Sequence, residues 1–176
     1  MKLSTIAENM TPIQLISDDA GEWIERKRQR GEIQFHFIQR DGTVDTNDNV
    51  YIAKGDGDKL PLKFGKVKGF DASNSSLSSI EGLPNEVRTN INLRGSKIVS
   101  LSGINNVIKR IGGTFYGASN MTHILGLLRI DGLDHVDLGD TQLNSIMNKY
   151  IGQGTDGIMK AQAELYDAGF PEQARL

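Results

Sequence analysis

The 176-residue chain contains no cysteine, which excludes both a disulfide framework and a metal site built on thiolates. It has no apolar stretch approaching the ~20 residues of a membrane span, and its first residues show no apolar run of signal-peptide length. Its 20 basic and 22 acidic residues almost cancel, to a net charge of −2, so composition gives no general support for binding nucleic acid or an anionic membrane. We therefore expect a soluble intracellular protein.

The chain also lacks the motifs that carry catalysis or bind cofactors. No Gly-rich run ends in the Lys-Ser/Thr of a phosphate-binding loop, and the three histidines do not have the local spacing of metal ligands. The acidic segment 45–49 is similar to a calcium-binding loop, but Val50 stands where that loop needs Gly, and Asp56 stands where it needs a bidentate Glu. No acid–base or nucleophile set stands out, so we predict no enzyme activity, no metal and no cofactor.

What the chain does contain is an eleven-residue pattern that returns four times between residues 67 and 146, at intervals of 21, 23 and 22 residues. Its characteristic positions are 1, 4, 6, 9 and 11, most of which hold apolar residues. The copies begin at Val67, Arg88, Ile111 and Leu133. A period of about 20–29 residues with this spacing is typical of a leucine-rich-repeat solenoid. The predicted fold class is α/β: a short leucine-rich-repeat-like solenoid with one β-strand per repeat, at positions 3–7 of each copy.

The segments outside the repeats predict different structures at the two ends. Residues 1–31 form a predicted N-terminal helical segment, with an amphipathic helix that starts at Thr11-Pro12 and continues to Arg30; Gly21 leaves two shorter helices as an alternative. In this helix the basic run 26–30 is expected to face solvent. Residues 32–66 form a predicted β-rich N-terminal cap that contains a degenerate repeat, because an end unit would otherwise expose a core face.

Two features support that β-rich cap, and helical periodicity marks the other end of the chain. Alternating residues from Ile33 to Ile38 lead into Asp41-Gly42, a strong hairpin signal, and a strand at 50–53 is expected to lie beside the first of the four repeats, which span 67–146. Apolar residues at helical spacing predict helices at 143–151 and 156–168. Residues 147–176 are therefore assigned to a C-terminal helical cap.

Three segments together carry a family resemblance: residues 60–70, residues 77–84 and the tail 150–176. They resemble the short leucine-rich-repeat proteins carried by large tailed bacteriophages, and the resemblance covers residues 40–176. In that family the later repeats more often keep a Gly-aliphatic-Pro ending, whereas here only Pro84 survives. The resemblance implies an accessory protein of a bacteriophage that acts by binding, and it supplies no catalytic residues to transfer.

The repeat register predicts a protein-binding surface, because position 5 of each copy points away from the core onto the exposed face of the sheet. The predicted binding residues at and beside this position are Asp71, Asn92, Arg94, Phe115, His135 and Asp137. Phe115 would be an outward aromatic anchor among small and polar residues, as is frequent in binding hot spots. The alternative is a one-residue register shift in the third and longest copy, which would put Phe115 inside and Tyr116 outside.

These observations favour a protein–protein interaction module: a bacteriophage accessory protein that binds a host or antiviral-defence protein in the host cytoplasm and inhibits or redirects it. One alternative is an acidic nucleic-acid mimic that inhibits a nucleic-acid enzyme and uses Asp71, Asp134, Asp137 and Asp140. Another is a structural or assembly protein that oligomerises through an edge of the solenoid, so a homo-oligomer remains open. Neither a membrane partner nor direct binding of nucleic acid is expected.

Overall fold

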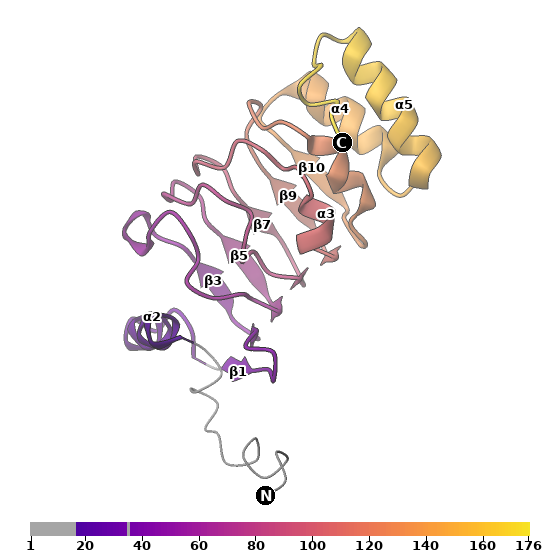
Figure 1. Cartoon of the computed structure of the whole chain (residues 1–176). Coiled ribbons are helices and arrows are strands. Elements are labelled where there is room, and N and C mark those ends of the chain that lie inside the picture. The colour runs from indigo at the N-terminus through magenta and orange to yellow at the C-terminus, as the bar shows by residue number, and fades with distance from the viewer. Residues whose placement is uncertain (1–16, 35) are drawn as a thin grey trace, which may run out of the picture.

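The computed structural model describes residues 17–34 and 36–176, in which two parallel sheets enclose a common core (Figure 1). The strands of the five-stranded sheet are, in spatial order, β3 (Asn49–Tyr51), β5 (Gly69–Asp71), β7 (Ile91–Asn92), β9 (Thr114–Tyr116) and β10 (His135–Asp137). The three-stranded sheet consists of β4 (Lys66–Val67), β6 (Glu86–Val87) and β8 (Arg110–Ile111). In both sheets the spatial order follows the chain order, so each coil, meaning one circuit of the backbone, lies beside the preceding one.

The prediction of one β-strand per repeat is wrong. Each of the first three repeats has a strand of the smaller sheet at or just before its start and a strand of the larger sheet within it. A two-stranded antiparallel sheet lies before them, so the fold is not a one-strand-per-repeat solenoid. Pairing in the larger sheet sets neighbouring coils about 4.8 Å apart. The opposite arms then come within hydrogen-bonding distance too: the amide of Arg88 donates to the carbonyl of Val67 at 3.0 Å, and that of Gly112 donates to Val87 at 2.9 Å.

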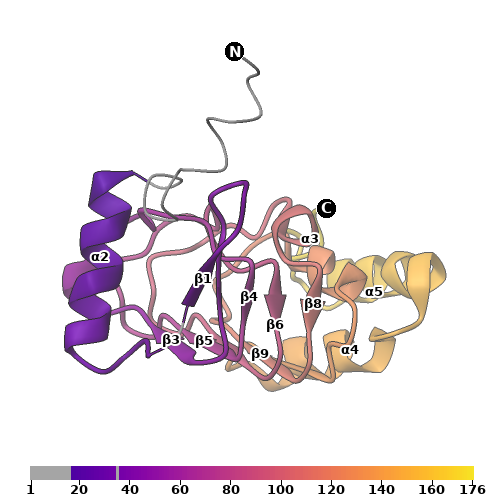
Figure 2. The same cartoon turned by 90° about the horizontal axis from the view of Figure 1, so that it is seen from below.

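The two parallel sheets run along the stacked coils (Figure 2). The core between them consists of side chains stacked in register. In the larger sheet one inward row contains Val50, Phe70, Ile91, Phe115 and Val136. In the smaller sheet the paired residues Val67, Val87 and Ile111 are fully buried. Each of these side chains is covered by its counterparts in the adjacent coils, so burial depends on stacking rather than on any single coil.

Helix α2 (Asp18–Gln29) covers the first end of this core. The hydroxyl oxygen of Ser17 accepts from the amide of Ala20 at 3.3 Å and caps the helix, which continues through Gly21 without a break. The buried Trp23 meets the ring of Phe64 edge-on at 5.9 Å between centroids, and Phe64 meets Phe70 in the same way at 6.1 Å. The start predicted at residues 11–12 lies outside the described residues.

The expectation that the whole basic run 26–30 faces solvent is wrong for Lys27, which is only 1% exposed. Its ammonium nitrogen lies 2.6 Å from a carboxylate oxygen of Glu32, 2.7 Å from one of Asp56 and 2.6 Å from the backbone carbonyl oxygen of Tyr51. A buried ammonium needs such partners, and here they lie in the segments that follow the helix. Lys27 thus joins α2 to β3, an edge strand of the five-stranded sheet.

The predicted hairpin and the predicted strand beside the first repeat are both confirmed. Strands β1 (His36–Ile38) and β2 (Val44–Thr46) pair antiparallel, and Gly42 in their turn has a φ of 81°. Strand β3 pairs in parallel with β5, the first strand of the repeats in the larger sheet. A short 3-10 helix, η2 (Lys54–Asp56), then places the carboxylate that Lys27 contacts.

Helices pack against the other end of the core. Short elements α3 (Ile104–Val107) and η3 (Ile124–Arg129) precede the two predicted C-terminal helices, which are present as α4 (Thr141–Tyr150) and α5 (Gly154–Asp167). The carboxylate of Asp140 caps α4 by accepting from the amides of Gln142 and Leu143, each at 2.9 Å. In the described part of the chain, no helix has the length and apolar character needed to cross a membrane.

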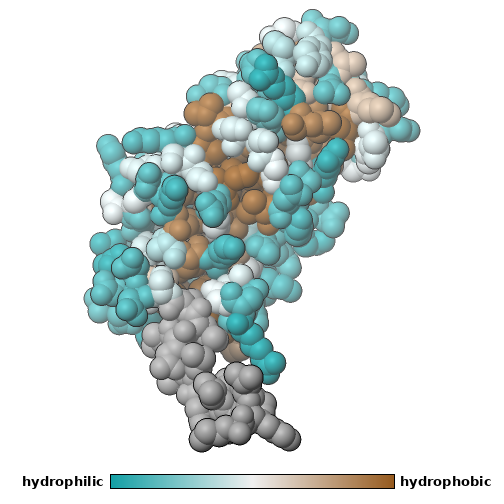
Figure 3. All heavy atoms as spheres, in the orientation of Figure 1, coloured by the Kyte–Doolittle hydropathy of each residue, from teal (hydrophilic) through white to brown (hydrophobic). Residues whose placement is uncertain are grey.

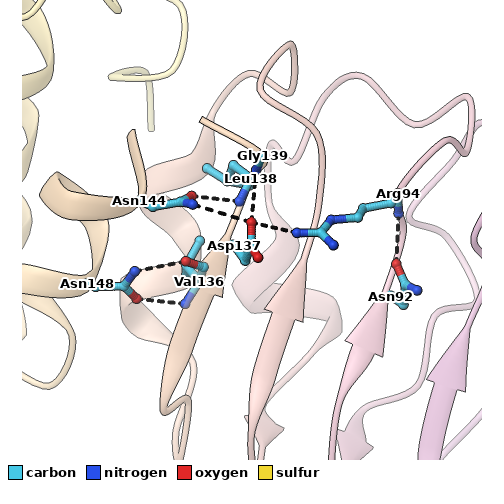
Figure 4. Close-up of polar contacts among 8 residues, drawn as sticks. All are labelled: Asn92, Arg94, Val136, Asp137, Leu138, Gly139, Asn144 and Asn148. Carbon is cyan, nitrogen blue, oxygen red and sulfur yellow. Dashed lines mark hydrogen bonds and ion pairs between the residues drawn. The ribbon is translucent and has the colours of Figure 1, made fainter. Parts of the chain in front are cut away.

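Two asparagines of α4 close the outer edge of β10 (Figure 4). The side chain of Asn148 accepts from the amide of Val136 at 2.7 Å and donates to the carbonyl of the same residue at 2.9 Å. Asn144, one helical turn earlier, accepts from the amide of Leu138 at 2.7 Å. The side-chain amides thus provide the hydrogen bonds that a further strand would provide, and the edge is not open to another chain.

Candidate binding face

The outward side of the five-stranded sheet, called the sheet face below, is lined by polar and aromatic side chains. Because side chains alternate along a strand, the neighbours of the buried inward row point outward. One outward row contains Tyr51, Asp71, Asn92, Tyr116 and Asp137, and the row at the start of the strands contains Asn49, Gly69, Asn90, Thr114 and His135. The structure therefore places five of the six predicted binding residues on or beside this face.

The predicted exposure of Phe115 is wrong: its side chain is fully buried. Phe115 pairs in register with Ile91 on one side and Val136 on the other, so the third coil is shifted by one residue from the predicted alignment. Its partner in the dipeptide, Tyr116, takes the outward position. This arrangement, with Phe115 buried and Tyr116 at the partly solvated face, is the physically favoured one. In the reverse arrangement the hydroxyl of Tyr116 would need a hydrogen-bond partner inside the core.

Three of the residues predicted to bind have a structural task as well. The side-chain oxygen of Asp71 accepts from the amide of Ser73 at 2.8 Å, that of Asn92 from Arg94 at 3.1 Å, and that of Asp137 from Gly139 at 3.0 Å. Each is an Asx turn that ends its strand and lets the chain leave the sheet. The need for an Asx turn at the end of each strand therefore explains in part why Asp or Asn recurs in this row.

Tyr116 is the exception in that row among the repeats, because a phenol cannot form an Asx turn. The guanidinium of Arg94 lies 5.0 Å from the centre of the Tyr116 ring, close enough for a cation–π contact. Arg94 extends from the end of β7 across β9 to Asp137, where a nitrogen and a carboxylate oxygen are 2.6 Å apart (Figure 4). The pKa of Asp137 is lowered, chiefly by this hydrogen bond and then by the one from Gly139.

Beside this cluster the sheet face is hollowed, with a volume of about 250 Å³. The hollow is lined by Asn49, Tyr51, Gly69, Phe70, Asp71, Thr89, Asn90, Asn92 and Tyr116. Gly69 keeps the floor open, because a Cβ there would lie 2.7 Å from the side-chain oxygen of Asn49 and 3.0 Å from that of Thr89. A polar floor between two tyrosines can receive a side chain or a loop that carries its own hydrogen-bonding groups.

The described residues show no arrangement typical of a metal centre, on this face or elsewhere. His135 is exposed at the start of the edge strand β10. Across residues 17–34 and 36–176, no group of three or more His, Asp or Glu side chains is arranged to hold a metal ion. Asp45 in the segment weighed as a calcium loop accepts from the amide of Lys66 at 2.7 Å, which gives its carboxylate a role in holding β4.

The sequence prediction missed Tyr51 on this face, and it placed Tyr116 there only in the alternative register of the third copy, which the structure bears out. The signal that could have identified Tyr116 is the Phe115-Tyr116 dipeptide. Either aromatic residue satisfies the repeat pattern, but only the tyrosine has a hydroxyl group that is favourably placed in solvent. Tyr51 lies in β3, before the first of the four copies.

Comparison with protein-family models, with curated proteins and with solved structures gave no match to this chain.

Proposed function

We propose that this protein binds another protein through the sheet face, with Tyr116 and the Arg94–Asp137 ion pair at the centre of the contact. The observation that carries the proposal is the tyrosine in a row where the neighbouring repeats use Asp or Asn for their backbone turns. Tyr116 has no such task, so its position in the row needs another explanation. Tyrosine and arginine are the side chains enriched at the energetic centres of protein interfaces.

The ordered side chains of the sheet face also favour binding. Asp71, Asn92 and Asp137 are fixed by their Asx turns, and Arg94 is held by both a ring and a carboxylate. Side chains ordered before the partner arrives lose little conformational entropy on association. A surface of tyrosines with asparagine amides offers large rigid contacts together with adaptable hydrogen bonds, a composition suited to protein recognition.

We further propose the setting that the sequence resemblance implies: a bacteriophage accessory protein that inhibits or redirects a host or antiviral-defence protein in the host cytoplasm. Mimicry of nucleic acid has less support. The carboxylate of Asp137 is paired with Arg94, and that of Asp71 accepts a backbone hydrogen bond, so neither presents the isolated charge of a phosphate.

The test uses the full chain as bait in a bacterial lysate, followed by titration of each purified captured protein against four baits: the wild type, Phe37→Ala, Tyr116→Ala and Tyr51→Ala. The wild-type chain and Phe37→Ala should bind equally, because Phe37 is an exposed aromatic on β1, outside the sheet face, with 65% of its surface accessible. Tyr116→Ala should weaken binding by about 30-fold, the effect of losing a hot-spot residue of about 2 kcal/mol.

Unfolding curves of the baits separate loss of contact from loss of structure. Because Tyr116 lies on the partly solvated side of the sheet, its replacement should leave the unfolding transition cooperative. The proposal fails if no protein is retained specifically. It also fails if Tyr116→Ala and Tyr51→Ala both bind as tightly as Phe37→Ala.

A further inference from the structure

Helix α5 has two apolar faces, and the residues that the structure describes cover only one of them. Gly157, Ile158, Ala161 and Leu165 are buried where the helix packs against α4 and η3. Met159, Ala163 and Tyr166 lie on the opposite side, and all three are exposed, Met159 by 57% and Tyr166 by 51%. Apolar surface is visible over this helix at the outer end of the molecule (Figure 3).

The three exposed residues follow helical spacing: Ala163 stands four positions after Met159, and Tyr166 stands seven positions after it. They therefore form one stripe along about two turns. Lys160 and Asp167, also seven residues apart, lie together along one flank of this stripe and carry opposite charges. Neither has an ion-pair partner within the described residues.

We infer that this stripe binds a second copy of the chain, with the two α5 helices antiparallel about a two-fold axis near Ala163. In such a pair residue 159 faces residue 166 of the other copy, so each Met159 packs on a tyrosine ring. On the flank, each Lys160 meets the other copy's Asp167, which gives two ion pairs. The small side chain of Ala163 lets the helix axes approach to about 8 Å at the crossing.

The arrangement of charge selects a second copy rather than an unrelated partner. A symmetric interface requires a surface that is complementary to itself when turned by 180°. A lysine three residues before the small central residue and an aspartate four residues after it come close to that requirement, as do a methionine four residues before it and a tyrosine three residues after it. The two pairs share almost the same centre, at residues 162–163 for the apolar pair and 163–164 for the charged pair.

The expected dimer is weak. The stripe is about 10 Å long at 1.5 Å per residue, so the contact is smaller than the ~1,600 Å² of a standard interface. We expect a dissociation constant between about 10 µM and about 1 mM. Because α5 is separate from the sheet face, this dimer is independent of the protein-binding function proposed above.

Sedimentation equilibrium of the full chain, with loading concentrations up to about 1 mM, tests the dimer. Ala163→Glu should abolish it by placing two like charges at the axis. Lys160→Glu should weaken it at least tenfold, because two attractive contacts become repulsive. The double variant Lys160→Glu/Asp167→Lys restores opposite charges across the axis and should return to within about threefold of the wild type.

The absence of cysteine allows a second test. Ala163→Cys should form a disulfide-linked dimer on mild oxidation, whereas Ser102→Cys, at an exposed position on the loop before α3, should not. Selective crosslinking and rescue by the charge swap would support the inference. A chain that remains monomeric at the highest concentration overturns it, as does a dimer that is indifferent to all of these substitutions.

Discussion

The two edges of the five-stranded sheet are covered in different ways: a buried ionic cluster lies at one edge and neutral side-chain amides lie at the other. At β3, the buried ammonium of Lys27 donates to the carbonyl of Tyr51, and the carboxylate of Asp56 accepts from both Lys27 and the amide of Ala53. At β10, the neutral amides of Asn144 and Asn148 provide the missing hydrogen bonds. Both solutions remove an open strand edge that could pair with another chain.

The difference lies in what happens when one partner is removed. A buried ion that loses its counter-charge retains the cost of its desolvation, whereas a neutral amide leaves only unpaired backbone groups. The β3 edge should therefore be the more sensitive of the two to substitution. The β10 edge should depend mainly on geometry, since two amides one helical turn apart must match two alternate residues of a strand.

The largest expected effect is at the ionic edge. Lys27→Met keeps most of the apolar stem but removes the positive charge that pairs with two carboxylates and the donor to one carbonyl, so the free energy of unfolding should fall by about 3 kcal/mol. Urea denaturation measures it. The matched control is Arg26→Met: the side chain of Arg26 is 55% exposed, and its replacement should change stability by less than about 0.5 kcal/mol. Similar stabilities for the two variants would contradict the role assigned to Lys27.

A smaller effect is expected at the amide edge. Asn148→Ala leaves the amide and carbonyl of Val136 unpaired in a partly buried setting and should cost about 2 kcal/mol; Asn144→Ala, which removes one such bond to Leu138, should cost about 1 kcal/mol. Asn106→Ala, on the exposed side of α3, is the control. The assignment is wrong if Asn148→Ala unfolds at the same urea concentration as this control.

Much of the fold could be predicted from sequence because its signals are local. Asp41-Gly42 marks the hairpin, and apolar residues at helical spacing mark α4 and α5. The second strand of each coil could not be found, because segments such as Glu86–Val87 are too short to show alternation. Lys27 looked like part of a solvated face because the partners that neutralise it lie 5 and 29 residues away along the chain.

The candidate site shows the same limit. The pattern located the exposed row and most of its residues, yet it could not decide between Phe115 and Tyr116 in the longest copy. That choice depends on the pairing of Phe115 with Ile91 and Val136 in space. The pattern also could not reveal that Asp71, Asn92 and Asp137 end their strands through Asx turns, since the same residue types suit a binding surface.

The smallest effect is expected on the sheet face, where Asp137 links β10 to Arg94. Its pKa is lowered in the folded protein, so the contribution of the ionised carboxylate is present above about pH 4 and is lost as the pH falls below that value. Asp137→Asn should cost at most about 1 kcal/mol at pH 7, because the pair is partly solvated.

The pH dependence provides the check for Asp137. Denaturation curves of the wild type and Asp137→Asn should converge as the pH is lowered below about 4. A difference in stability that stays constant over this range would show that the ion pair is not its source. A difference that grows on acidification would reverse the sign assigned to the carboxylate.

The most direct test of the binding role is a footprint of the bound partner on this chain. Backbone amide spectra recorded as the captured protein is added should show the largest changes at Tyr51, Asn92, Arg94 and Tyr116, with α5 unaffected at protein concentrations too low for dimers. Changes confined to α2, α5 or the three-stranded sheet, with the sheet face silent, would contradict the account.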